Sequence, residues 1–302
     1  SGLIRFAVLA FLVSPSAQAR AATQQDNAPP AGAERTAAWN AEKSDMAPDA
    51  SIIYGRLPNG LRYAIRPNDH PQNQTLMRMT VDFGSAAEAD DEQGLAHFIE
   101  HMVFNGTTHV AEGEMVPMLE RLGLAFGADT NASTGYTRTI YQLDLPKADP
   151  FLTERALFLF RETASEVLFD NDAVDRERGV VLAEMRQRES YNFQALRVSN
   201  DFFYPGSYFS TRYPIGLKSI LETAPADRMK ALYHKWYRPD RVRIVIVGPV
   251  NVRAIERQIV ERFSDWQRAD NGPADFDSCR LDSGRPAKAA IFAHDEISET
   301  IS

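Results

Sequence analysis

The sequence predicts an α+β fold, in which a mixed or antiparallel sheet packs against helices. Short apolar runs with strand composition are interspersed with longer segments of helical periodicity, and no internal repeat is evident. The first two strand-like runs flank Asn59-Gly60, which is the strongest short signal for a β-hairpin. With 302 residues, 44% of them hydrophobic and 25% charged, the chain can bury one or two substantial cores.

The expected strands are apolar runs bounded by turn residues. In chain order they span 52–57, 61–66, 75–83, 125–132, 138–145 and 241–247. The first predicted helix is capped by Asp90 or Asp91 and stops at Asn105-Gly106, with glycine in its usual C-terminal place. The other helices span 112–122, 153–168, 172–201, 225–236 and 252–266. We expect Asn171 or Asp172 to cap the longest of them.

The first residues have the organisation of a secretory signal peptide over 1–19. Arg5 precedes the apolar run Phe6–Val13, and Ala17-Gln18-Ala19 supplies a small-residue cleavage site. The run is too short to span a bilayer, and a buried helix or an uncleaved anchor is the alternative. Cleavage after Ala19 implies a periplasmic or secreted bacterial protein. Residues 20–50, rich in Ala, Pro, Gln and Asp, are expected to form a disordered tether.

The charge balance argues against nucleic acid as a partner. The chain has 41 acidic and 33 basic residues, a net charge of −8, and no basic stripe interleaved with aromatic residues. Cys279 is the only cysteine, so no intrachain disulfide can form and a metal site can take at most one thiolate.

The segment His97-Phe98-Ile99-Glu100-His101 places two imidazoles and a carboxylate on one face of an otherwise apolar helix. Residues four apart on a helix are neighbours, so both imidazoles can reach one Zn²⁺ at about 2.0–2.1 Å. Glu100 lies one turn after His97, where it can act as general base on the zinc-bound water. The order His-x-x-Glu-His is the inverzincin signature. Chance is the alternative, and it is disfavoured because the chain has only 6 histidines.

A catalytic zinc usually takes three protein ligands, so a third must come from elsewhere in the chain. Glu177 and Glu184 lie on one stripe of the predicted helix 172–201. Seven residues span nearly two turns, so the two carboxylates share an azimuth but lie about 10 Å apart along the axis. Only one can bind the metal, and the other can hold a ligating imidazole by its free N–H. Two solvated surface glutamates are the alternative.

Further segments match a known family in an ordered series. They are Leu57–Leu61, Phe104–Thr107, Asn131–Thr134, Arg176–Glu184, Pro214–Gly216 and Trp236–Pro239. With the inverted motif, they make the chain from Ser51 onward resemble the pitrilysin/insulinase family of zinc peptidases, which includes the mitochondrial processing peptidases. The resemblance implies that residues 51–270 form a zinc-binding peptidase domain, one processing-peptidase-like half of a clamshell. Residues 271–302 would then be a linker and the start of a truncated second domain.

The resemblance also bears on the third ligand. In the family it is the later glutamate of a pair separated by six residues, which assigns Glu184 to the metal and Glu177 to the support of an imidazole. The usual spacing from the second histidine would instead favour Glu177. We follow the local pattern, since the stretch 143–153 looks longer than in processing peptidases and absorbs the difference.

By resemblance, the function is that of a zinc-dependent metalloendopeptidase that hydrolyses extended peptides, with Zn²⁺ as cofactor and Glu100 as base. A sheet edge formed by Asn131, Ala132, Ser133 and Thr134 would bind the peptide as an added strand, and Phe104 would line a side-chain pocket. A local turn and a core phenylalanine are the alternatives for these two features. A second peptidase domain or partner subunit would complete the site. The alternative function is a non-catalytic peptide-binding subunit of a two-chain processing peptidase.

Overall fold

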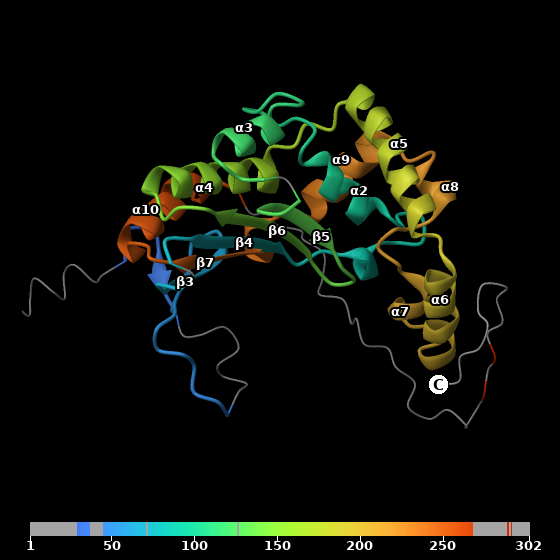
Figure 1. Ribbon diagram of the computed structural model, residues 1–302, viewed down its shortest axis with the longest axis horizontal. Coiled ribbons are helices and arrows are strands. Elements are labelled where there is room, and N and C mark those ends of the chain that lie inside the picture. The colour runs from blue at the N-terminus through green and yellow to red at the C-terminus, as the bar shows by residue number, and fades with distance from the viewer. Residues whose placement is uncertain are drawn as a thin grey trace, which may run out of the picture.

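A seven-stranded sheet lies at the centre of the computed structural model (Figure 1). The structure describes residues 29–36, 45–70, 72–125 and 127–267, together with residues 289 and 291. The strand order is β1-β2-β3-β7-β4-β6-β5, in which only the β3–β7 pair is parallel. The strands are β1 Glu34–Arg35, β2 Ile53–Arg56, β3 Arg62–Pro67, β4 Thr75–Val81, β5 Thr130–Thr134, β6 Thr139–Leu145 and β7 Val242–Gly248.

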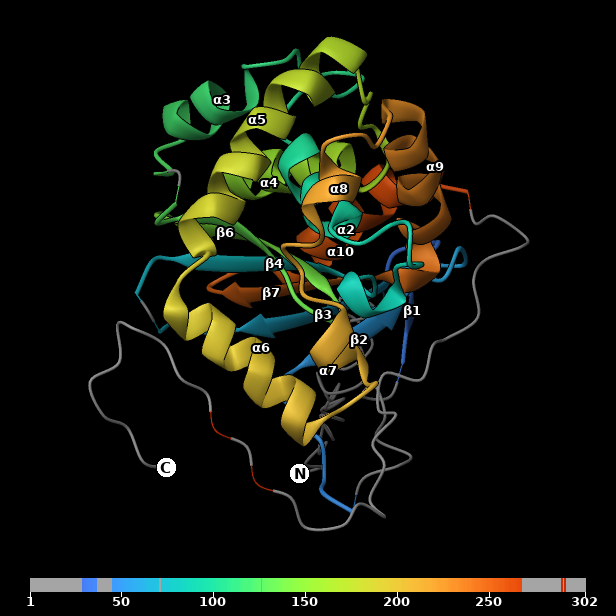
Figure 2. The ribbon, with the colours of Figure 1, turned by 90° about the vertical axis from the view of Figure 1, so that its right-hand side faces the viewer.

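Most helices cover one face of this sheet, whereas α6 and α7 extend past its end (Figures 1 and 2). The longer helices are α2 Leu95–Met102, α4 Pro150–Ser165, α5 Asn171–Arg188, α6 Tyr191–Phe203, α9 Ala226–Trp236 and α10 Val252–Phe263. The short ones are α3 Met115–Arg121, α7 Tyr208–Thr211 and α8 Lys218–Leu221, with 3-10 turns η2 Ser85–Ala87 and η3 Pro239–Arg241.

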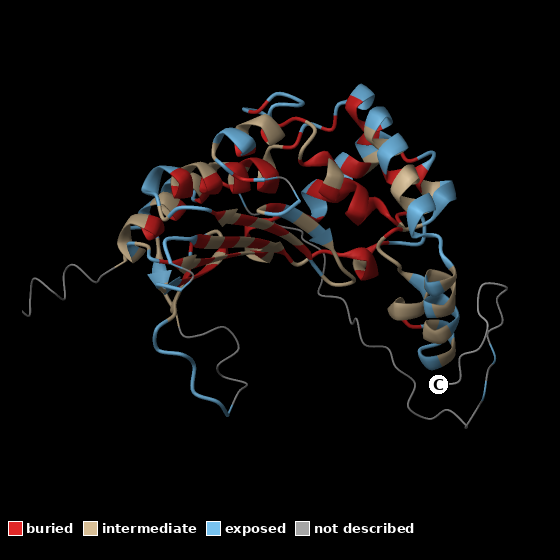
Figure 3. Cartoon of the chain, viewed as in Figure 1, coloured by how far each residue is buried: buried red, intermediate tan, exposed pale blue. Residues whose placement is uncertain are grey.

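The core lies between the sheet and its helical layer, as the band of buried residues in Figure 3 shows. Strands β4, β6 and β7 alternate strictly between buried and partly exposed residues, because successive side chains of a strand point to opposite faces. Met79 and Ile244 are fully buried on the helical side. Burial of each such side chain stabilises the fold by about 1.5–3 kcal/mol. This burial holds the helical layer, which includes α2, against the sheet.

The predicted fold class is confirmed, since the observed fold is a mixed sheet packed against helices. The Asn59-Gly60 hairpin joins β2 to β3, and Gly60 has the positive φ of 100° that the turn requires. The Asn59 amide also donates to the carbonyls of Phe263 and Trp266, which fastens the turn to the end of α10.

Several local expectations are wrong, among them that α2 would stop at Asn105-Gly106, whereas it ends at Met102. The helix predicted over 172–201 is two helices, because the first ends at Arg188 and the Ser190 hydroxyl caps the second. The cap of that first helix is Asp170, not Asn171 or Asp172. Helix α2 begins after Gly94 rather than Asp90 or Asp91, whose carboxylates pair with arginines.

The segment expected to be a tether contributes to the sheet. Glu34 and Arg35 pair with Arg56 and Gly55 of β2, and the Arg35 guanidinium binds Glu256 of α10 at 2.9 Å. The proposed signal peptide over 1–19 lies outside the described residues, as does 271–302 apart from residues 289 and 291. Among the described helices, none combines the length and the apolar composition that a membrane crossing needs.

Candidate metal centre

Helix α2, which carries His97, Glu100 and His101, is held in place by its neighbours. It packs against α5 on one side and against the edge strand β5 on the other. At its start, Gly94 has a φ of 99° and lies against Gly216, so that the two backbones approach without side chains between them. The buried carboxylate of Glu88 accepts hydrogen bonds from the N–H groups of Gly94 and Ala96, at 3.0 and 2.7 Å. These bonds satisfy donors that a helix start leaves open.

Three side chains converge where α2 faces α5. The Nε2 atoms of His97 and His101 are 3.3 Å apart, and Oε2 of Glu184 lies 3.5 Å from the first and 3.2 Å from the second. Bond lengths of about 2.0–2.1 Å in a tetrahedral zinc site imply ligand atoms separated by about 3.3–3.4 Å. Within the described residues this is the group of histidine and carboxylate atoms close enough to hold one metal ion. Two imidazoles and a carboxylate therefore fit zinc.

Glu177 contacts the opposite nitrogen of the same imidazole. Its Oε1 lies 2.7 Å from Nδ1 of His101, while Glu184 faces Nε2. The second oxygen of Glu177 accepts a hydrogen bond of 3.0 Å from the amide of Asn105. The two glutamates of α5 thus lie on different sides of His101, and Glu177 stays outside the group that could hold a metal.

The electrostatics favour a neutral, ligating His97. Burial lowers the pKa of His97 to about 4, and the neighbouring His101 acts in the same direction. For His101, burial also disfavours the charged form, but the hydrogen bond and charge of Glu177 outweigh it and raise the pKa. Burial acts to raise the pKa of Glu184, yet the charges of His97 and Arg188 hold it below its usual value. An ionised carboxylate beside a neutral imidazole is the state in which both can bind a metal.

Glu100 lies beside the three converging groups and is only 8% exposed. Thr134, the last residue of β5, donates a hydrogen bond of 2.5 Å to Oε2 of Glu100. Burial raises the pKa of Glu100, although this hydrogen bond opposes the shift. A carboxylate with a raised pKa is a stronger base, so it is better suited to accept a proton and return it.

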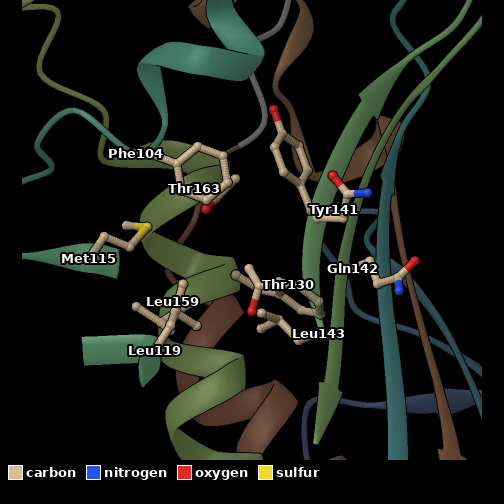
Figure 4. A pocket seen from close by; sticks show the side chains of 11 residues that line it. Phe104, Met115, Leu119, Thr130, Tyr141, Gln142, Leu143, Leu159 and Thr163 are labelled. Carbon is tan, nitrogen blue, oxygen red and sulfur yellow. The ribbon is translucent and has the colours of Figure 1, made fainter. Parts of the chain in front are cut away.

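The residues suggested for substrate binding lie beside this group. Strand β5 pairs with β6 alone among the described strands and forms an edge of the sheet. Asn131 and Ser133 are exposed on it, Ala132 is partly exposed, and Thr134 turns its hydroxyl to Glu100. Phe104 lines an apolar pocket next to the strand (Figure 4). The other lining residues include Met115, Leu119, Asn131, Tyr141 and Leu159.

Sequence reasoning did not identify the roles of three residues around the site, Arg188, Asn105 and Glu88, nor the contact of Thr134 with Glu100. Arg188 binds Oε1 of Glu184 at 2.5 Å, and its position four residues further along the helix is a pairing signal that was available. Asn105 was noted only as part of a matching segment. Glu88 binds the start of α2 from outside the helix, and Thr134 reaches Glu100 from another element of the fold. No local sequence pattern indicates either contact.

Comparisons with known proteins show which peptidase family the chain matches. The family model for insulinase (peptidase family M16) matches residues 63–203, and that for the peptidase M16 inactive domain matches residues 223–289. The probable zinc protease PqqL of Haemophilus influenzae is 35% identical over 216 residues, which are 72% of this chain and 23% of that protein. The stromal processing peptidase of Oryza sativa subsp. indica is 30% identical over 204 residues, 66% of this chain and 16% of that protein.

Solved structures agree with these matches. The first half of the periplasmic protease PqqL from Escherichia coli has a TM-score of 0.74 at 30% identity, covering 77% of this chain and 50% of that one. Pitrilysin, at 20% identity and a TM-score of 0.66, shares the fold over 82% of this chain and 26% of that one. The chain spans about a quarter of the length of three full-length relatives that it matches, at 23%, 23% and 25%.

Proposed function

Because the chain belongs to the insulinase family of peptidases (family M16), we propose that it is the catalytic domain of a zinc-dependent endopeptidase. His97, His101 and Glu184 would hold the metal. The observation that carries this proposal is the convergence of their ligand atoms, 3.2–3.5 Å apart, beside the buried carboxylate of Glu100.

The chain's own residues supply the proton transfers. Zn²⁺ bound in this position would polarise the scissile carbonyl and make a water molecule more acidic. Glu100 is the group placed to take the proton of the attacking water and to return it to the leaving amine. Thr134 occupies Oε2 of Glu100, and within the described residues Oε1 makes no hydrogen bond and is available for this exchange.

The supporting groups have separate tasks. Glu177 would hold His101 by Nδ1, so that Nε2 faces the metal. Arg188 would hold the second oxygen of Glu184, so that Oε2 faces the two imidazoles. Both contacts orient ligands that otherwise could rotate.

The substrate would be an extended peptide that adds to the edge of β5. Backbone hydrogen bonds to such an edge give affinity with little sequence preference, and alternate side chains of the peptide reach pockets. Asn131 and Ser133 are the exposed residues of the strand, with Ala132 between them. The pocket lined by Phe104 has a free volume of about 20 Å³, room for about one water molecule, so its side chains would have to move apart to accept an apolar side chain of the peptide.

We further propose that the protein acts in the bacterial periplasm and that a second peptidase domain or partner subunit closes over the site. A relative of known structure is described as a periplasmic protease, and this chain matches half of the first half of that protein. Closure would exclude water and so strengthen each electrostatic contact with the reacting groups.

The test separates metal binding from chemistry. Glu100→Gln preserves size but removes the base, so the variant should bind as much zinc as the wild type. Its cleavage of a quenched fluorescent peptide, measured with the second domain or subunit present, should fall by about 10²–10⁴-fold. Undiminished cleavage by this variant would disprove the mechanism, and absence of cleavage by the wild type would favour a non-catalytic peptide-binding subunit.

A further inference from the structure

Asn105 contacts His101 directly at its backbone carbonyl and indirectly, through Glu177, at its ring. Its Nδ2 donates to the backbone carbonyl of His101 at 3.1 Å and to Oε2 of Glu177 at 3.0 Å. The other oxygen of Glu177 lies 2.7 Å from Nδ1 of the His101 ring. The three side chains therefore form a closed circuit that begins and ends on His101, between the end of α2 and the middle of α5.

The hydrogen bonds of this circuit engage the Asn105 amide nitrogen and both carboxylate oxygens of Glu177. An amide nitrogen has two hydrogens, and both donate here. The Glu177 carboxylate has both oxygens engaged, so it cannot turn toward Nε2 of His101 without losing a hydrogen bond. A carboxylate can only accept, so Nδ1 of His101 must carry the proton, which leaves the lone pair of the neutral ring on Nε2.

We propose that Asn105 is a positioning residue that locks Glu177 onto Nδ1 and thereby keeps Nε2 of His101 directed at the zinc. This inference rests on the proposed function and adds a residue to it. It also explains why two glutamates seven residues apart on one helix have different tasks. Asn105 binds Glu177, whereas Glu184 is bound by Arg188 and faces the two imidazoles.

Zinc affinity measured by competition with a chromophoric chelator tests the proposal through a double-mutant cycle. Loss of a group that orients a ligand typically costs about 10–100-fold in metal affinity. We expect Glu177→Ala to fall in this range and Asn105→Ala to lose about tenfold. In the Glu177→Ala background, Asn105→Ala should change the affinity by less than about twofold, because the bond that Asn105 then still makes, to the His101 backbone carbonyl, does not hold the imidazole ring.

Asn200 offers a matched control. Its amide also donates to a backbone carbonyl, that of Phe209 at 3.2 Å, in a partly buried setting on α6. Asn200→Ala should leave zinc affinity unchanged, and circular dichroism should show that each variant is folded. Asn105→Ser, which keeps one donor, should have an affinity between those of the wild type and Asn105→Ala. Equal affinity of wild type and Asn105→Ala, or the same loss in both backgrounds, would overturn the proposal.

A second measurement needs neither zinc nor activity. In metal-free protein labelled with ¹⁵N-histidine, the Nδ1–H proton of His101 should give a slowly exchanging signal, assigned by its absence in His101→Ala. Asn105→Ala should accelerate its exchange about tenfold, as expected for loss of roughly one hydrogen bond's worth of protection. Unchanged exchange would overturn the role of Asn105, whereas a wild type that binds no zinc would overturn the proposed function instead.

Discussion

Thr134 at the end of the edge strand β5 donates a 2.5 Å hydrogen bond to Oε2 of Glu100 on helix α2. The strand proposed to bind the peptide and the carboxylate proposed to act as base are thus joined by one contact. Movement of the strand would be transmitted to the base, so peptide binding and proton transfer share a structural element.

Thr134→Val keeps the shape of the side chain but removes this donor. A hydrogen bond to a charged group contributes about 1.5–3 kcal/mol, so kcat should fall by roughly 10–100-fold. The hydrogen bond lowers the pKa of Glu100 against the effect of burial. Its loss should therefore raise that pKa and move the acidic limb of the activity profile to higher pH. Thr134→Ser should retain near-normal kcat, and Thr80→Val, on the less buried face of β4, is a control.

The two glutamates of α5 should differ in their effect on zinc content. Glu184→Gln removes a carboxylate oxygen that lies 3.2 and 3.5 Å from the two Nε2 atoms, so most of the zinc should be lost. Glu177→Gln weakens only the hold on Nδ1 of His101 and should lose about 10–100-fold in affinity. Metal analysis of the purified variants decides the matter, and the opposite ranking would exchange the two assignments.

Glu88 should make stability depend on pH. Burial raises its pKa to about 8, although the N–H groups of Ala96 and Gly94 act to lower it, while Glu92 and Arg212 face it with opposing charges. A folded-state pKa above the unfolded value means that the stabilisation is complete at acidic pH and is lost as pH rises toward about 8. The free energy of unfolding of the metal-free protein should therefore decline from pH 5 to pH 8.

Urea denaturation across this range gives the measurement. His101 also titrates with a raised pKa, so the contribution of Glu88 is the difference between the wild type and Glu88→Gln. The variant should show a flatter dependence on pH. Parallel curves for the two proteins would contradict the assignment.

Gly216→Ala should destabilise the start of helix α2. Gly216 has a φ of 74°, which strains any L side chain, and an added Cβ would overlap the backbone of Gly94. Gly113 has a φ of 78° with nothing within 4 Å of an added Cβ, so Gly113→Ala isolates the strain. We expect Gly113→Ala to cost about 1–2 kcal/mol and Gly216→Ala about 1–3 kcal/mol more. Equal losses in urea denaturation would show that the close approach is unimportant.

Much of the site follows from local sequence. The helical repeat alone places His97, Glu100 and His101 on one face, because their relative positions depend only on the backbone of a single helix. The hairpin at Asn59-Gly60 and the alternating strands are likewise local, since a turn and a period of two specify them. The α+β fold class could therefore be predicted.

The ends of the helices are harder to predict from the sequence. The break at Ser190 depends on whether one hydroxyl caps a new helix or the old one continues, and the periodicity on either side is compatible with both. The start of α2 depends on Glu88, a buried carboxylate contributed from outside the helix. Such caps compete at similar free energies, so packing selects among them.

The amino-acid sequence alone identifies the two imidazoles, the carboxylate between them and the pair of glutamates from which a third ligand could come. The packing of the folded chain is what sets Glu184 against Nε2 and Glu177 against Nδ1 of His101, and brings Thr134 to Glu100. The reason is physical. Residues on one helix are related by a fixed repeat, whereas the position of α5 and β5 relative to α2 is set by the packing of a core that no short segment encodes.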